Sequence, residues 1–160
     1  AGEVRLDRQA REERRREPAR HALMGFAWGL SALALLIGAG LGARALIDPA
    51  WAAKFVRLKA DEQGGGQAEF RATYGGVFLG LHLVALLFTL LYWQSGAYVI
   101  GVSATGASAA IAAGWAGAAF GRGIAIWRDG ADTPFNRMSI GVEIAMAFAI
   151  AMPWLVWFLL

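Results

Sequence analysis

The sequence predicts an all-α integral membrane bundle of four transmembrane helices, with a charged N-terminal arm and a short interfacial helix. Two observations lead to this fold class. Hydrophobic residues make up 58% of the 160 residues and charged residues only 17%, whereas about a quarter of a soluble domain is charged. The apolar residues also gather into four runs that are long enough, at about 1.5 Å per helical residue, to cross a hydrocarbon core of about 30 Å.

The distribution of charge argues against nucleic-acid binding. The formal net charge is +3, but seven of the fifteen basic residues lie within the first twenty positions. No basic face therefore remains in the rest of the chain for a duplex. The chain contains no cysteine, which excludes disulfides and thiolate metal sites.

Residues 1–21 form the charged arm. Carboxylates and arginines recur at helical spacing over residues 3–17, as in the pair Asp7 and Arg11. Such pairs support an exposed helix. We expect a solvated, partly helical arm that Pro18 interrupts. An arm that docks on a partner protein is the alternative.

The transmembrane domain covers residues 22–160, and its first span covers about 22–47. The apolar run of this span is about twice as long as the core of a signal peptide, so we expect it to remain uncleaved. A short helix at about 49–59 should follow, because Asp48 is a good N-cap and Pro49 suits a first helical position. Its alternating apolar and basic residues are typical of an interfacial helix; they are Trp51, Lys54, Phe55, Arg57, Leu58 and Lys59.

The other three spans cover about 70–93, 98–121 and 138–160. The connection at 95–97 is too short for anything but a tight turn, so the second and third spans must be antiparallel neighbours. Pro153 predicts a kink in the last span. The third span should be the most tightly enclosed helix, because small residues follow one face. This small-residue stripe consists of Gly106, Ala110, Gly114, Gly117 and Gly121.

Charged residues gather at the membrane face where the first and third spans end and the second and fourth begin. A lipid-facing, unpaired carboxylate there costs about 2.5 to 3.5 kcal/mol. Glu143 should therefore face inward and pair with Arg71 or Arg122, either as a structural ion pair or as part of a polar pocket for a ligand head group. We name as the charged cluster Glu69, Arg71, Tyr74, Arg122 and Glu143, with Arg44 at the same level.

Three groups of residues follow one another in a recognisable order: Glu69-x-Arg71-Ala72-x-Tyr74-Gly75-Gly76, then Gly121-Arg122 with Asp129-Gly130 and Pro134, then Glu143 in the last span. This pattern resembles that of a bacterial family of small four-helix membrane proteins, catalogued as domain of unknown function 4345. The resemblance covers about residues 25–157. It implies the fold and a membrane location, and no activity.

The two histidines do not predict a haem site within the chain. His82 should lie near the midplane and His21 at the membrane edge, so their depths differ by about half a bilayer. We expect His82 to be a neutral interhelical hydrogen-bond donor. A pigment or haem shared with another subunit, with His82 as its single ligand, is the alternative; otherwise we expect no cofactor and no metal.

No catalytic motif of the GxSxG, HExxH or phosphate-loop type is present. We therefore expect a non-catalytic accessory or structural subunit of a larger bacterial inner-membrane complex, with lipids and other membrane subunits as partners. The alternative is a binder or transporter of a small amphiphile or lipid that uses the charged cluster. The arginines before the first span place both termini in the cytoplasm.

Overall fold

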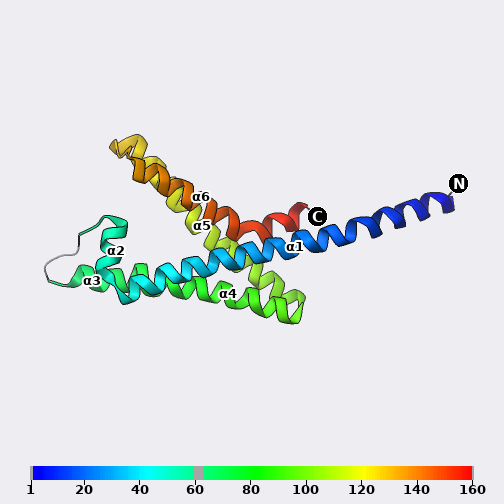
Figure 1. The fold of residues 1–160 in the computed structure, drawn as a ribbon, viewed down its shortest axis with the longest axis horizontal. Coiled ribbons are helices and arrows are strands. Elements are labelled where there is room, and N and C mark those ends of the chain that lie inside the picture. Colours follow the sequence, from blue (N-terminus) through cyan, green and yellow to red (C-terminus); the bar gives the residue numbers. More distant parts are fainter. Residues whose placement is uncertain (1, 60–62, 160) are drawn as a thin grey trace.

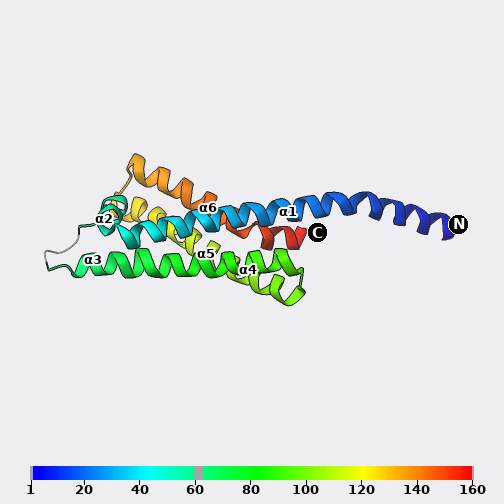
Figure 2. The same ribbon diagram turned by 60° about the horizontal axis from the view of Figure 1, so that its bottom comes forward.

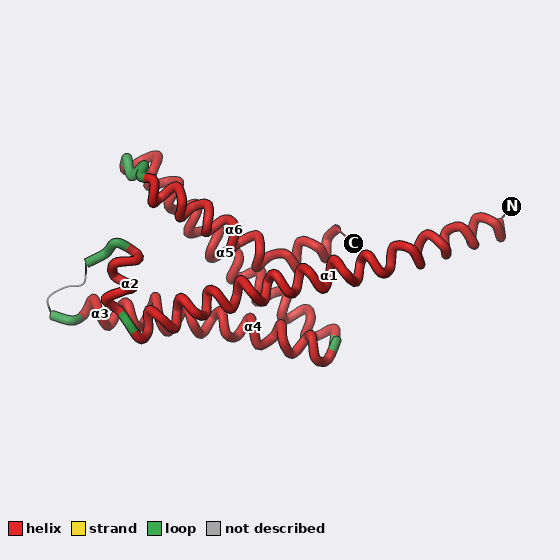
Figure 3. Tube along the Cα trace, viewed as in Figure 1, coloured by secondary structure: helices red, strands yellow, loops and turns green. Residues whose placement is uncertain are grey.

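The computed structural model describes residues 2–59 and 63–159, and all the regular structure in them is helical. Figure 3 shows helices joined by short loops. In chain order the elements are α1 (Gly2–Ile47), α2 (Pro49–Val56), α3 (Gly65–Glu69), the π-helix η1 (Phe70–Val77), α4 (Phe78–Ser95), α5 (Tyr98–Asp129) and α6 (Pro134–Leu159).

The four predicted spans are confirmed. Four helical segments are long and apolar enough to cross a membrane: Glu17–Ile47, Gly65–Ser95, Tyr98–Asp129 and Pro134–Phe158. The chain is therefore a multi-pass membrane protein. The α4–α5 turn lies at the end of the bundle where α6 ends, and α1 leaves the bundle at that same end (Figure 1), as an even number of spans requires.

The expected break at Pro18 is wrong, because α1 is helical on both sides of this residue. A proline removes one backbone hydrogen bond, and the residues around Pro18 are exposed, so water can satisfy the freed carbonyl. In Figures 1 and 2 the N-terminal part of α1 continues alone beyond the other helices. The ion pairs expected over residues 3–17 involve side chains that lie outside the described part of the chain.

Several helix boundaries differ from the expected ones: α2 ends at Val56 instead of 59, and the helix of the second span begins at Gly65 instead of 70. α5 continues to Asp129 instead of ending near 121, and α6 begins at Pro134 instead of 138. α5 is longer than expected because a second apolar stretch, residues 123–127, follows Arg122 and continues the helix. Gly130 ends α5 with φ at 65°, a left-handed conformation that glycine adopts at little cost.

The core lies where α1, α4, α5 and α6 cross. Leu35 and Ile150 are completely buried there. Ser31 donates a hydrogen bond from Oγ to the Ile150 carbonyl at 3.0 Å, close to the carbonyl that Pro153 leaves without an amide partner. Away from this crossing, the α5–α6 hairpin diverges from the α1–α4 pair (Figure 1).

α1 and the second span approach each other at glycines. A Cβ placed on Gly42 would lie 2.5 Å from the backbone nitrogen of Leu79, and one on Gly75 would lie 2.8 Å from Cα of Leu46. One on Gly38 would overlap the ring of His82. These contacts require glycine because no side chain fits between the helices.

The expectation that the third span is the most tightly enclosed is wrong. All members of the small-residue stripe are exposed, and nothing lies within 4 Å of where a Cβ would stand on any of its glycines. The opposite face of α5 is buried instead. That face is also made of small residues, so the sequence did not distinguish the two: Gly101, Ala104, Ser108, Ala112 and Ala119.

Gly42→Val should destabilise the fold, because the added methyl groups meet the backbone at Leu79. Overpacking of this kind costs about 1 to 3 kcal/mol. Gly40→Val is the matched control, since Gly40 lies two residues away in α1 and its Cβ would meet nothing within 4 Å. The measurement is the fraction of monodisperse protein that remains after heating in detergent. Equal melting temperatures for the two variants would contradict the close contact.

Candidate functional site

The structure divides the charged cluster into two groups. Glu69, Arg71 and Tyr74 lie at the start of the second span, beside the end of α1. Arg122 and Glu143 lie on the α5–α6 hairpin, which diverges from α1 at this end (Figure 1). A single five-residue constellation is therefore not observed.

Arg71 contacts the C-terminus of α1. Its Nη1 donates hydrogen bonds to the carbonyls of Leu46 and Ile47, the latter at 3.3 Å. The last carbonyls of a helix have no partner within the helix, and a cation is favourable at this end of the helix dipole. Arg71 thus caps α1, and the expected alternative pairing of Arg71 with Glu143 is not formed.

The neighbours of Arg71 also make local contacts. Glu69 accepts a hydrogen bond from the Thr73 hydroxyl, and the Tyr74 ring lies 5.5 Å from that of Phe70 between centroids. The Arg44 guanidinium lies 4.6 Å from the centre of the Trp51 ring, a cation–π contact. The first two pairs join residues one turn apart in the second span, and the Arg44–Trp51 contact joins α1 to α2.

Glu143 pairs with Arg122, which confirms one of the two expected partners. Arg122 Nε donates to Glu143 Oε1 at 2.7 Å, and Glu143 is only 7% exposed. Arg122 Nη1 also approaches Asn136 Oδ1 at 3.5 Å, while Asn136 Nδ2 donates to the Ala131 carbonyl at 2.7 Å. Asn136 is not among the predicted site residues, although its position seven residues, or about two helical turns, before Glu143 could have indicated it.

One atom of this pair is unexplained by the contacts within the chain. Glu143 Oε2 is buried and has no hydrogen-bond partner among the described residues. A buried acceptor of this kind in a native protein usually meets a water, an ion or a ligand group. The Arg122–Glu143 pair is therefore the part of the charged cluster that retains binding capacity.

Outside the spans, Asp132 lies in the α5–α6 connection and accepts two hydrogen bonds from Arg137, at 2.6 and 2.5 Å. These hydrogen bonds hold the pKa of Asp132 below its ordinary value. Because the pair is exposed to solvent, its contribution to stability is small. Its role is local, since it holds the connection against the first turn of α6.

His82 is buried between three helices, next to Gly38 of α1 and Trp115 of α5. Its Nδ1 lies 2.7 Å from the Phe78 carbonyl, and Trp115 Nε1 donates to its Nε2 at 3.1 Å. A carbonyl only accepts and an indole N–H only donates, so the ring is the neutral Nδ1–H tautomer. His82 is therefore an interhelical acceptor, whereas a donor was expected, and both ring nitrogens are engaged.

These contacts argue against His82 as the single ligand of a haem. An iron ligand needs the lone pair of a ring nitrogen, and in this arrangement the indole of Trp115 occupies that of His82 Nε2. The part of the chain that the structure describes also contains no group of three or more His, Cys, Asp and Glu residues arranged for a metal ion.

Comparisons with known proteins found no matching family model, no matching curated protein and no matching solved structure. The resemblance carried by residues 69–76, 121–134 and 143 therefore stays a prediction.

Breaking the Arg122–Glu143 pair should destabilise the protein. Removing one partner of a buried pair costs about 3 to 5 kcal/mol of folding free energy. About one third of the Arg122 side chain is exposed, so water can partly solvate its charge, and we expect Glu143→Ala to lose an amount near the lower value. Glu143→Gln keeps an acceptor for Arg122 and should lose less. The measurement is the melting temperature in detergent.

The double variant Arg122→Leu/Glu143→Leu should recover stability, since neither charge is then left unpaired in lipid. Arg137→Gln is the control, because it breaks the exposed ion pair on the same hairpin. A Glu143→Ala protein as heat-resistant as the parent would show that the pair is not a structural contact.

Proposed function

We propose that this protein is a non-catalytic accessory or structural subunit of a larger membrane complex, and that α5 docks against a transmembrane helix of a partner. The observation that carries the proposal is the exposed small-residue stripe on α5. Gly42 of α1 and Gly75 of η1 lie against backbone of the neighbouring helix, whereas a Cβ on any glycine of the stripe would meet nothing within 4 Å.

The way in which helices associate in a bilayer supports docking through the small-residue stripe. Helices in a bilayer gain little from hiding apolar side chains, so association depends on close packing, and small residues allow backbones to approach. Gly106 and Gly121, the ends of the stripe, are separated by fifteen steps of about 1.5 Å, or about 22 Å along the helix axis. That length is most of the hydrocarbon thickness. A continuous contact between two helices in the bilayer would use a face of this length.

The N-terminal part of α1 supports the same proposal. It projects as a helix beyond the other spans (Figure 2) and carries most of the charge of the arm. An isolated helix gains its stability chiefly from packing on another element. A subunit that docks through both α5 and the arm would use both features.

A second candidate function, the binding of a small amphiphile, rests on one atom. Glu143 Oε2 is buried without a partner and would accept a hydrogen bond from a ligand head group. Against it, Arg71 is engaged by the end of α1 and Arg122 by Glu143 itself. A Glu143→Gln protein that accumulates normally but loses its function would favour this candidate.

Bulky residues on the stripe should release the protein from its complex. Gly114→Leu/Gly117→Leu fills the open face of α5, and Gly40→Leu/Gly80→Leu makes the same changes at exposed glycines of α1 and α4 that also have no neighbour within 4 Å. After gentle detergent extraction, native electrophoresis should show the parent and the control in a large complex and the stripe variant as a small particle.

All three proteins should melt at similar temperatures in detergent, because neither double substitution touches the core. A parent protein that migrates only as a small particle would overturn the proposal. So would a stripe variant that stays in the complex.

We further propose a bacterial inner-membrane location with both termini in the cytoplasm, which the seven arginines before the first span favour. The chain has no cysteine, so single cysteines report sidedness without background. A membrane-impermeant maleimide should label Gly65→Cys in intact spheroplasts and Ser95→Cys only after permeabilisation. The reverse pattern would invert the orientation.

A further inference from the structure

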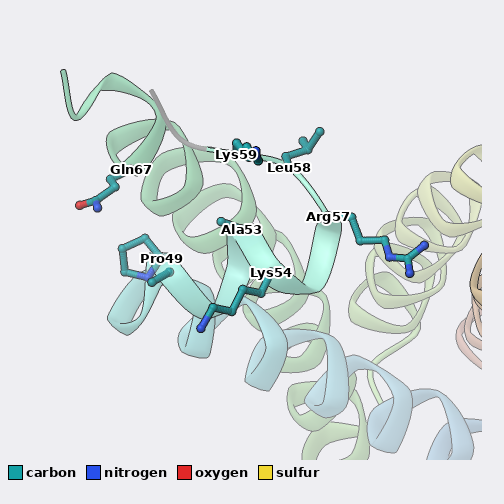
Figure 4. Close-up of a pocket in the computed structure, with 8 residues that line it drawn as sticks. Pro49, Ala53, Lys54, Arg57, Leu58, Lys59 and Gln67 are labelled. Carbon is teal, nitrogen blue, oxygen red and sulfur yellow. The ribbon is translucent and has the colours of Figure 1, made fainter. Parts of the chain in front are cut away.

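A pocket of about 470 Å³ lies against α2, at the end of the bundle where α1 ends (Figure 4). Pro49 and Ala53 give it apolar walls, and Lys54, Lys59 and Gln67 add polar groups. Figure 4 shows these side chains coming from α2, from the segment after it and from α3. The pocket is distinct from the charged cluster.

α2 is held at the level where the spans end. The Asp48 carboxylate accepts from the backbone N–H of Trp51 at 2.9 Å and so caps the helix. Ala52 is buried against Phe70, at the start of the second span. Trp51 and Phe55 stack with ring centroids 5.0 Å apart, and Phe55 remains half exposed. A short helix with buried, aromatic and cationic sides at this depth is typical of the headgroup region.

The charged side chains that line the pocket are all basic; Asp61 and Glu62, which follow Lys59 in the sequence, lie outside the described part of the chain. Neither Lys54 nor Lys59 has an ion-pair or hydrogen-bond partner among the described residues, and Asp48 is engaged as the helix cap. Arg57 is turned away from the two lysines towards the α5–α6 hairpin (Figure 4), where its guanidinium lies 4.3 Å from the centre of the Phe135 ring. Figure 4 shows Lys54 and Lys59 on different sides of α2, so each ammonium group is separately open to an anion at the pocket.

We propose that this pocket binds an anionic phospholipid, whose headgroup is attracted by Lys54 and Lys59. The charge of the pocket fits the phosphate, and its place in the headgroup region brings such lipids to it at high local concentration. Leu58 lines the pocket and is exposed, so it suits contact with an acyl chain, which a free phosphate or an acidic protein segment does not supply. Arg57 meanwhile joins α2 to α6, so the lipid lies beside a contact between the two halves of the bundle.

Native mass spectrometry of the purified chain tests this. The protein is released from mixed micelles that contain equal amounts of phosphatidylglycerol and phosphatidylcholine, and the lipids that stay bound are counted. The parent should retain phosphatidylglycerol in preference. Lys54→Gln or Lys59→Gln should each lower the relative affinity about fivefold, and the double variant about 25-fold, given the usual effect of one basic residue at an anionic membrane surface.

Matched variants separate a built pocket from general attraction. Lys54→Arg/Lys59→Arg keeps the charges and should keep the preference. Arg128→Gln removes one exposed charge at the same end of the bundle and should leave the preference unchanged. All the substituted side chains are exposed, so unchanged melting temperatures are expected throughout.

Three results would overturn the proposal. The first is equal retention of the two lipids by the parent. The second is a Lys54→Gln/Lys59→Gln protein that keeps the preference. The third is displacement of the lipid by millimolar inorganic phosphate, which would show that the pocket recognises the anion alone.

Discussion

The backbone contact between α1 and the second span is the constraint on which the rest of the structure depends. In lipid there is no water to drive helices together, so their association requires close packing, and Gly42 and Gly75 provide it. This contact brings Arg71 to the last carbonyls of α1. It also lets the ring of His82 lie beside Gly38 and reach Trp115 on α5.

The π-helix η1 belongs to the same corner. Its hydrogen bonds run five residues along instead of four, which makes a wider turn than an α-helix, and such turns are uncommon and often occur at special sites. Here η1 carries both Arg71 and Gly75, so the cap on α1 and the close contact to Leu46 come from one segment. Phe70, the first residue of η1, is buried together with Ala52 of α2, so η1 also contributes to the position of α2.

The sequence predicts the spans well because their signal is local: length, hydropathy and the charges between them. It predicts that Glu143 pairs with Arg71 or Arg122, because a carboxylate in lipid needs a partner, and the structure shows Arg122. It cannot tell which face of α5 is buried, since both faces carry small residues. It also cannot show that Arg71 contacts α1, because the pattern of side chains does not indicate which backbone carbonyls accept hydrogen bonds.

The continuity of α1 through Pro18 has a geometric consequence. A helix fixes rotation as well as distance, at about 100° and 1.5 Å for each residue. The fifteen residues from Gly2 to Arg16 therefore reach about 22 Å past the first span, which begins at Glu17, with their orientation set by the bundle. Lengthening this part of α1 by one residue would turn its far end by more than a quarter of a circle, whereas a flexible tether would absorb the same insertion.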